Sequence, residues 1–240
     1  MRLGAQVIVA QEYADIDAAR RATRSIPIVT VFALDPVKAG FAQSLARPGG
    51  NVTGVMYGDP AFTAKSVQLL KEALPDMKRL GHLYPTGSGV DHYVDAIEAA
   101  ARALGVSFYR FPISRPGDVS AALSSAKKER IDALRVTLAG PGSQELDQIL
   151  AFAASNKIPS YFSAAIAVER GGFMSYSPKF SDNAARAASF VDRILKGANP
   201  AELPFEYSTR YELAINLKTA KQLGITVPQS VLLRADRVIE

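Results

Sequence analysis

The chain has 240 residues, 48% hydrophobic and 21% charged, which is ordinary for a globular protein with two small domains or one large one. Its net charge of +5 is spread without long runs of like charge, so the sequence gives no support for a nucleic-acid partner. Because the chain has no cysteine, disulfides, thiol nucleophiles and zinc-thiolate sites are excluded.

The first residues contain no recognisable targeting signal. The stretch before Val7 lacks the apolar region of a signal peptide, and no later stretch approaches the length of a membrane-spanning helix. We therefore expect a chain without its own signal peptide.

Residues 26–56 read as a complete strand–helix–strand unit. The apolar, β-branched run Ile26–Ala33 predicts a strand buried on both faces. Asp35-Pro36 then predicts a helix start, and Arg47-Pro48 predicts its end before a strand at Val52–Met56. Such a crossover predicts parallel strands, with the Leu34–Asp35 loop at their carboxyl edge, where open α/β sheets bind ligands.

The rest of the chain repeats this alternation of strands and helices. The predicted strands span 6–10, 26–33, 52–56, 80–84, 106–111, 131–138, 159–162, 173–176, 203–208 and 211–215. The predicted helices span 16–24, 36–45, 60–74, 90–104, 116–128, 143–153, a short turn up to 170, 180–196, 217–223 and the tail after 228. The alternation predicts an α/β fold of doubly wound parallel sheets, with Pro75–Arg79 and Ser177–Lys179 as candidate crossings between two lobes.

The sequence contains few candidate catalytic residues. His82 falls inside a predicted strand and His92 on a helix, which favours packing and solvation over proton transfer. Ser88 lacks the spacing of a nucleophile elbow, and Gly140–Ser143 matches only half of a phosphate-binding loop. Metal-ligand spacing is also missing, so we expect no catalytic residue, metal or cofactor.

Polar and aromatic residues instead collect where the predicted strands end. Tyrosine offers a flat apolar face and one hydrogen-bonding tip, so several of them at strand ends favour recognition over catalysis. Asp35 is interpreted first as a helix cap and second as a ligand contact. The strand-end residues are Gln11–Tyr13, Leu34–Asp35, Tyr57, Tyr84–Ser88, Leu138–Gly140, Tyr161–Ser163 and Tyr176.

Several segments resemble the ABC transporter substrate-binding proteins of the tryptophan/tyrosine-binding type. The most specific is the run Arg-Pro-Gly-Gly-Asn-Val-Thr-Gly at residues 47–54. The others are Ile26–Val29, Asp35–Val37, Leu69–Pro75, Gly171–Tyr176, Val191–Gly197 and Glu212–Gly224. The resemblance covers nearly the whole chain.

The resemblance implies a type I periplasmic-binding-protein fold, in which two α/β lobes close on a small ligand in the cleft between them. It also implies an ABC permease in the membrane as partner and a periplasmic or membrane-anchored extracytoplasmic location. The expected first lobe spans residues 1–77 and about 177–200, and the expected second lobe spans 78–176 and about 201–240. The oligomeric state and the assignment after Gly197 stay open.

Carried over residue by residue, the resemblance gives a ligand-binding set drawn from both lobes. The first lobe would supply Gln11, Glu12, Tyr13, Leu34, Asp35 and Tyr57. The second lobe would supply Tyr84, Thr86, Ser88, Ala139, Gly140 and Tyr161, with Tyr176 near the return crossing.

The sequence also departs from the family pattern. Leu34 stands where family members usually have glycine, so the ligand need not be the one in the family name. Family members have about two strand–helix units ahead of the strand at Val7–Ala10. We therefore expect an N-terminally truncated chain with an incomplete first lobe and exposed apolar edges.

The leading prediction is a solute-binding component of an ABC importer that captures a small molecule such as an aromatic amino acid. One alternative is the effector-sensing module of a transcription regulator, which shares this fold, although no DNA-binding segment is present. A small α/β enzyme is the other alternative, and the sparse catalytic inventory speaks against it.

Overall fold

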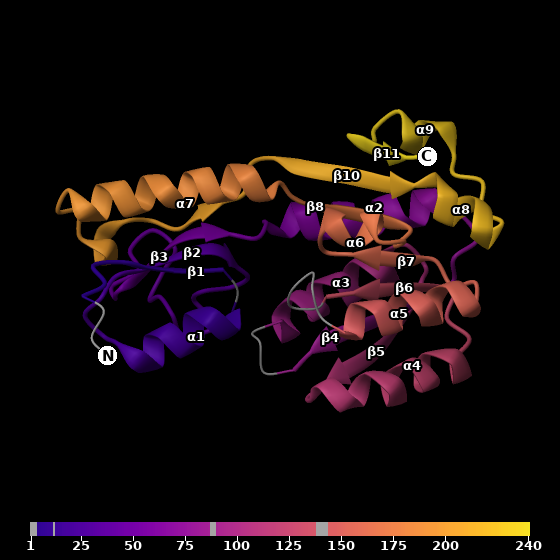
Figure 1. Cartoon of the computed structure of the whole chain (residues 1–240), viewed down its shortest axis with the longest axis horizontal. Coiled ribbons are helices and arrows are strands. Elements are labelled where there is room, and N and C mark those ends of the chain that lie inside the picture. Colours follow the sequence, from indigo (N-terminus) through magenta and orange to yellow (C-terminus); the bar gives the residue numbers. More distant parts are fainter. Residues whose placement is uncertain (1–3, 12, 87–89, 138–143) are drawn as a thin grey trace. The chain divides into compact units, whose positions relative to one another are not determined.

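The computed structural model describes residues 4–11, 13–86, 90–137 and 144–240. They form an α/β protein that divides into two compact units (Figure 1). Unit 1 comprises residues 1–59 and 178–210, and unit 2 comprises residues 60–177 and 211–240.

Unit 1 is built on a four-stranded parallel sheet in the order β1-β2-β3-β9. Alternate strand residues face opposite helices, because side chains in a strand alternate between its two faces. Ile28 packs with Ile16 of the first helix, whereas Val29 packs with Phe190 of the last. The elements are β1 (Ile8–Ala10), α1 (Tyr13–Ala22), β2 (Ile28–Ala33), β3 (Val52–Met56), α7 (Phe180–Leu195), the short 3-10 helix Pro200–Glu202 and β9 (Glu206–Tyr207).

The β2 strand is buried on both faces, as its unbroken apolar run predicted. Ile28 and Val29 are fully buried although they point to opposite sides. The strand on each side of β2 pairs with it in parallel, which confirms the predicted parallel pairing of 26–33 with 52–56.

The prediction of a helix at residues 36–45 is wrong. The segment forms hydrogen-bonded turns, in which the Phe41 and Ala42 amides both donate to the Pro36 carbonyl at 2.8 and 3.0 Å. Gly40 has φ of 69°, a left-handed conformation that ends helical hydrogen bonding after one turn. Asp35 still caps the segment, since its carboxylate accepts the Lys38 amide at 3.1 Å.

The β1 strand lies at one end of the sheet order of unit 1. Val9 in its middle is 57% exposed, and Phe180 at the start of α7 is 56% exposed. An apolar groove runs beside them on the sheet face that α7 covers only in part. The groove is lined by Val9, Gln11, Val31, Phe180, Ala184, Ala187, Ala188 and Val191.

Unit 2 contains a seven-stranded sheet in the order β11-β10-β8-β7-β6-β4-β5. The pairs β4–β5, β4–β6, β6–β7, β7–β8 and β10–β11 are parallel. The strands are β4 (Arg79–Pro85), β5 (Ser107–Ile113), β6 (Ala133–Val136), β7 (Ser160–Phe162), β8 (Met174–Pro178), β10 (Tyr211–Asn216) and β11 (Arg237–Ile239). The helices are α2 (Pro60–Ala73), α3 (Asp91–Ala103), α4 (Val119–Lys128) after the 3-10 turn Pro116–Asp118, α5 (Gln144–Ser155), α6 (Ala165–Glu169), α8 (Leu217–Leu223) and α9 (Gln229–Leu232).

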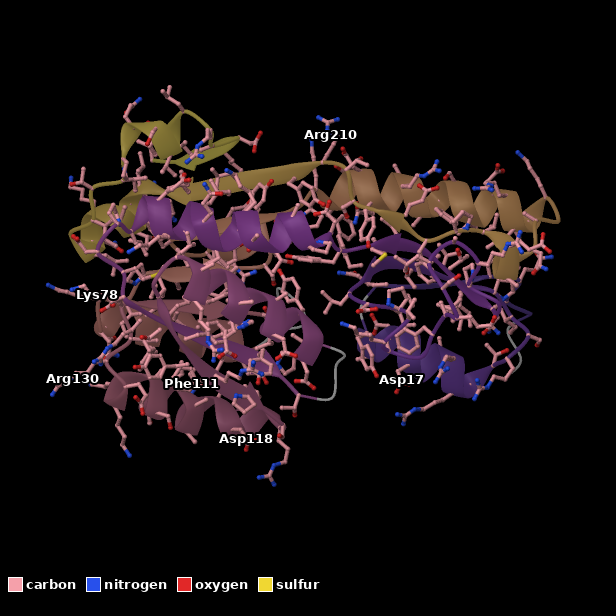
Figure 2. All side chains as sticks on the ribbon, turned by 180° about the vertical axis from the view of Figure 1, so that it is seen from behind. Asp17, Lys78, Phe111, Asp118, Arg130 and Arg210 are labelled. Atoms are coloured by element: carbon pink, nitrogen blue, oxygen red, sulfur yellow. The ribbon has the colours of Figure 1, made fainter. Side chains whose placement is uncertain are left out.

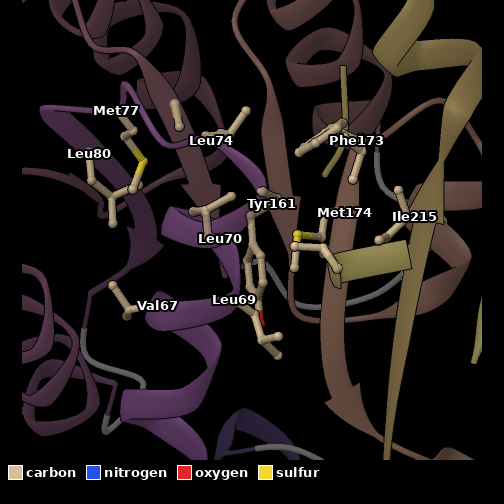
Figure 3. Close-up of a cluster of buried hydrophobic side chains, with 14 of the residues drawn as sticks. Val67, Leu69, Leu70, Leu74, Met77, Leu80, Tyr161, Phe173, Met174 and Ile215 are labelled. Carbon is tan, nitrogen blue, oxygen red and sulfur yellow. The ribbon is translucent and has the colours of Figure 1, made fainter. Parts of the chain in front are cut away.

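Two apolar clusters fill unit 2, one on each face of its sheet. The first joins α2 and α3 to the strands, and in it Tyr161 lies among Leu69, Leu70 and Met174 (Figure 3). The second packs α4 and α5 against the other face, where Leu134 is fully buried. Charged side chains such as Lys78 and Arg130 extend outward from this unit (Figure 2).

The two units differ from the expected lobes at two places. The α2 helix belongs to unit 2, because it packs against α3 and the large core cluster rather than following the strands before it. Residues 201–210 belong to unit 1, because β9 pairs with β3. The chain therefore passes between the two compact units at 59/60, 177/178 and 210/211.

Candidate ligand-binding site

In unit 1, three strands end beside one another and bring several predicted site residues together. Gln11 follows β1 and is exposed, and its carbonyl accepts the Phe32 amide at 3.0 Å. Tyr57 follows β3, and its amide donates to the Ala33 carbonyl at 2.8 Å. Because β1, β2 and β3 are parallel neighbours, these ends form one edge, as expected for a ligand-binding edge.

The other described residues of the set in unit 1 have packing contacts of their own. Tyr13 begins α1 and packs its ring 5.1 Å from that of Phe41. The Asp35 carboxylate is used in capping, and its second oxygen lies 3.7 Å from Lys38 Nζ. Leu34 beside it is half-buried. The capping role predicted for Asp35 is therefore present, and its ligand contact stays a prediction.

In unit 2, the next predicted site residues, Tyr84 and Thr86, lie at the carboxyl end of β4. Tyr84 is buried with its ring 5.2 Å from His82, and this burial raises the pKa of the Tyr84 hydroxyl. Thr86 is exposed, and its hydroxyl donates to Ser114 Oγ at 3.0 Å. These contacts place Tyr84 in the core behind the edge and Thr86 on the edge itself.

Tyr161 is the middle residue of β7 and Tyr176 the middle residue of β8, and the two contact one another. Tyr161 is fully buried, and its hydroxyl donates to the Tyr176 carbonyl at 2.6 Å and accepts the Tyr176 amide at 3.3 Å. Tyr176 is half-buried and stacks on Phe62 at 5.3 Å. The Tyr161 hydroxyl thus holds the middle of β8 in place, a supporting role that its sequence position did not reveal.

Four members of the predicted set, Glu12, Ser88, Ala139 and Gly140, lie outside the described residues. Their contribution stays a prediction.

Sequence reasoning left one central residue undecided. Arg135 occupies β6 and could point to either face of a sheet, but it is fully buried. The register pairs it with His82 of β4 and with Tyr161 of β7, so the three side chains form one row on the same face. An arginine inside an otherwise apolar strand was the one available signal.

His82 lies in this row as a buried, neutral side chain. Burial lowers its pKa well below the ordinary histidine value, and the nearby Arg135 and Arg110 guanidinium groups lower it further. Its Nε2 lies 3.0 Å from Thr137 Oγ1, a hydroxyl rather than a carboxylate. The packing role that the sequence favoured for His82 is confirmed by its full burial.

The described residues include no group of three or more His, Cys, Asp or Glu side chains that could hold a metal ion. Within the same residues, no helix is both long and apolar enough to cross a bilayer.

A model of the family described as ABC transporter substrate binding protein matches residues 4–239. The tyrosine-binding protein of Clostridioides difficile strain R20291 is 29% identical over 209 residues, which are 87% of this chain. The chain spans 60% of the length of that curated relative.

Two solved structures agree closely in fold. The ABC domain from Streptococcus pneumonia in complex with L-Trp has a TM-score of 0.91 at 28% identity, covering 99% of this chain and 80% of that one. A conserved domain protein from Vibrio cholerae has a TM-score of 0.89 at 29% identity, covering 97% and 78%. The expected fold of type I periplasmic binding proteins is confirmed, and the chain belongs to the ABC transporter substrate binding protein family.

Proposed function

We propose that this chain is a solute-binding component of an ABC importer and that it captures a small molecule such as an aromatic amino acid. The residues proposed to contact the ligand come from the strand ends of both units: Gln11, Glu12, Tyr13, Leu34, Asp35, Tyr57, Tyr84, Thr86, Ser88, Ala139, Gly140, Tyr161 and Tyr176. Capture would proceed by hydrogen bonding and aromatic stacking, without turnover.

One observation carries the proposal: several of the described site residues lie directly after the carboxyl ends of parallel strands. In unit 1 these residues are Gln11, Leu34 and Tyr57, and in unit 2 Thr86 follows the end of β4. Tyrosine and amide side chains at such an edge provide stacking faces and hydrogen bonds for a small polar-aromatic solute. Family membership and the L-Trp complex of the Streptococcus structure support the same ligand class.

The test is calorimetric titration of the purified chain with L-Trp, L-Tyr and the other standard amino acids. We expect saturable binding of one ligand per chain for an aromatic amino acid, and a melting temperature that rises with its concentration. Product formation from a bound solute would contradict the proposal, as would the absence of saturable binding across the whole amino-acid set.

A pair of tyrosine variants separates the site from the rest of unit 1. Tyr57→Ala removes a half-buried ring at the β3 end and should weaken binding about tenfold or more. Tyr207→Ala removes a 41% exposed ring from β9 of the same unit and should leave the affinity unchanged. Equal effects of the two substitutions would argue against the proposed edge.

We further propose that the loaded protein works outside the cytoplasm and passes its ligand to an ABC permease in the membrane. Family membership supports this partner, since importers of this type pair a binding component with a permease.

A further inference from the structure

Two buried polar side chains of unit 1 contact the strands that lead to the proposed ligand-binding residues. Asn183 stands in the first turn of α7 and Ser208 directly follows β9, and they are 3% and 5% exposed. Asn183 Nδ2 donates to Ser208 Oγ at 2.7 Å, so the two side chains form one polar pair. Buried hydrogen bonds of this kind fix the local geometry, because an unpaired polar group in the core is costly.

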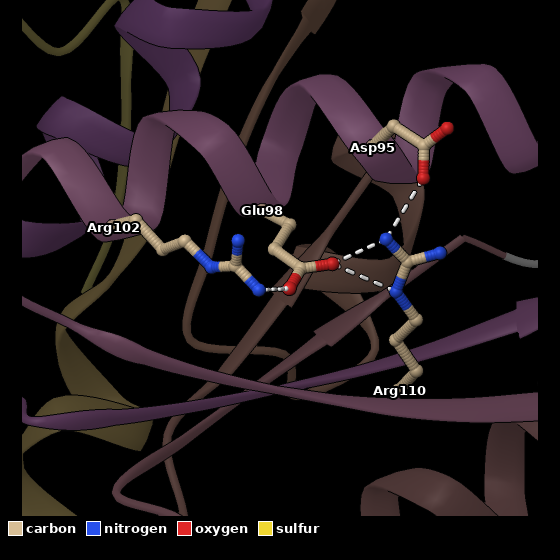
Figure 4. A network of polar contacts seen from close by, with 4 residues as sticks. All are labelled: Asp95, Glu98, Arg102 and Arg110. Carbon is tan, nitrogen blue, oxygen red and sulfur yellow. Dashed lines mark hydrogen bonds and ion pairs between the residues drawn. The ribbon is translucent and has the colours of Figure 1, made fainter.

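This pair differs from the polar network on the surface of unit 2. There Arg110 binds Glu98 and Asp95 in contact with solvent, where ion pairs contribute little to rigidity (Figure 4). Because Asn183 and Ser208 are shielded from water, we expect their hydrogen bonds to hold the attached backbone more tightly.

Asn183 contacts β2 where the pairing of that strand is irregular. Residues 30–33 of β2 lie opposite only residues 54–56 of β3, which is a β-bulge. In this bulge, Asn183 Nδ2 also donates to the Val31 carbonyl at 3.0 Å. Because a bulge bends the strand and redirects the residues beyond it, this contact helps to fix the direction of Leu34–Asp35.

Ser208 contacts the end of β3. Its hydroxyl donates to the Met56 carbonyl at 2.6 Å, and its amide donates to the same oxygen at 3.3 Å. Met56 is the last residue of β3, and the proposed ligand contact Tyr57 follows it. The polar pair therefore holds both β2 and β3 close to the point where their ligand-binding residues begin.

The same pair lies near two of the places where the chain passes between units. The crossing at 177/178 precedes Asn183, and the crossing at 210/211 follows Ser208. On the unit 1 side of these crossings, the Lys179 amide donates to the Arg210 carbonyl at 3.0 Å, and the Asn183 amide donates to the Lys179 carbonyl at 3.2 Å. A connected set of hydrogen bonds thus joins β2 and β3 to these two crossing segments.

We propose that Asn183 and Ser208 are positioning residues that couple ligand capture at the edge of unit 1 to the order of the crossing segments. The inference rests on the proposed function and deepens it, because it assigns a regulation to the same site. A ligand that orders the ends of β2 and β3 stabilises the polar pair, and the pair in turn stabilises the hydrogen bond between Lys179 and Arg210.

Hydrogen exchange of the ligand-free protein, followed by NMR, provides the first test. The two reporter amides are that of Tyr57, which donates to the Ala33 carbonyl at the edge, and that of Lys179 at the crossing. We expect Asn183→Ala to speed exchange of both at least about tenfold, because it removes the side chain that connects them. An effect on one amide alone, or on neither, would overturn the inference.

The matched control is Asn216→Ala in unit 2. Asn216 is also a buried amide, whose Nδ2 donates to the Val168 carbonyl at 2.9 Å and whose Oδ1 accepts the Thr219 amide at 3.0 Å. This substitution should leave both reporter amides within about threefold of their wild-type exchange rates. Acceleration equal to that caused by Asn183→Ala would show a general loss of stability and overturn the inference.

Saturation with L-Trp or L-Tyr tests the coupling itself. The bound amino acid should slow exchange of the Lys179 amide at least about tenfold in the wild type and in Asn216→Ala, but less than about threefold in Asn183→Ala. Equal protection in Asn183→Ala would overturn the inference. Calorimetric titration shows separately whether these amino acids bind: failure of both would count against the proposed ligand class, and the ligand-free exchange would then decide the inference alone.

Circular dichroism and thermal melting establish whether Asn183→Ala folds. Should it fail to fold, Ser208→Ala and Ser208→Thr decide, because the first removes the hydroxyl that joins Asn183 to Met56 and the second keeps it. Ser208→Ala should speed exchange of both reporter amides at least about tenfold, whereas Ser208→Thr should keep them within about threefold of wild type. Equal exchange in the two variants would overturn the inference.

Discussion

Gly54, the last residue of the run 47–54 that resembles the family, is a glycine for a structural reason. It lies in β3 with φ of 134°, a conformation that side chains rarely adopt. A Cβ added there would lie 2.5 Å from both the amide nitrogen and the carbonyl oxygen of Thr30 in the neighbouring strand. The glycine therefore permits the close approach of β3 to β2.

We predict that Gly54→Ala destabilises the protein by about 2 to 4 kcal/mol, because neither the backbone angle nor the contact with Thr30 can relax cheaply. Gly50→Ala is the control, since a Cβ at this position of the same run meets nothing within 4 Å. It should change stability by less than about 0.5 kcal/mol. Urea unfolding of both variants checks the prediction, and a Gly54→Ala protein as stable as Gly50→Ala would refute it.

At the scale of elements, an aromatic group marks the places where the chain enters and leaves unit 2. Phe62 follows the first crossing, Tyr176 precedes the second and Tyr211 follows the third. The Phe62 ring stacks on Tyr211 at 4.6 Å and on Tyr176 at 5.3 Å. Three segments far apart in the sequence are thus fixed to one another within unit 2.

We expect Phe62→Ala to cost about 3 to 5 kcal/mol, because it leaves a cavity between two rings at a buried position. Phe180→Ala is the matched control: Phe180 also stands near a crossing, but it is 56% exposed, so its truncation should cost under about 1 kcal/mol. Chemical denaturation measures both. Similar losses from the two truncations would mean that the stacked group contributes no special stability.

The sequence predicted elements well where local pattern and tertiary packing agree. The amphipathic pattern of residues 180–196 matches α7 almost to the residue, and the buried run of β2 is where it was expected. The helix at 36–45 failed because a left-handed Gly40 and the turns around it outweigh the apolar spacing. The short strand β11 was not predicted, because a strand of only three residues shows no clear alternation of apolar and polar side chains.

The site was predictable at the level of strand ends and not at the level of side-chain partners. Alternation predicted that Gln11, Tyr57 and Thr86 follow strand ends, and they directly follow β1, β3 and β4. It could not tell that the Tyr161 hydroxyl bonds to the backbone of the next strand. Nor could it decide the direction of Arg135, because that depends on register with β4 and β7.

At the scale of the whole molecule, the described apolar core falls into clusters that each lie within one unit. Two clusters belong to unit 1, around Ile28 and Val29, and two belong to unit 2, around Leu70 and Leu134. The sheet of unit 1 has four strands and an exposed Val9 at its edge, whereas that of unit 2 has seven strands. Because the two units have separate cores of unequal size, we expect them to unfold locally with different free energies.

Native-state hydrogen exchange should therefore show at least about tenfold faster exchange for the amides of β2 than for those of β6, because each of these strands is paired on both sides within its own sheet. Leu134→Ala sharpens the test, because Leu134 is fully buried in a cluster confined to unit 2. It should speed exchange in β6 and leave β2 unchanged if the units open separately. Equal acceleration in both strands would show that the chain opens as one cooperative body, so that stability gained from a ligand at either edge would protect the whole molecule alike.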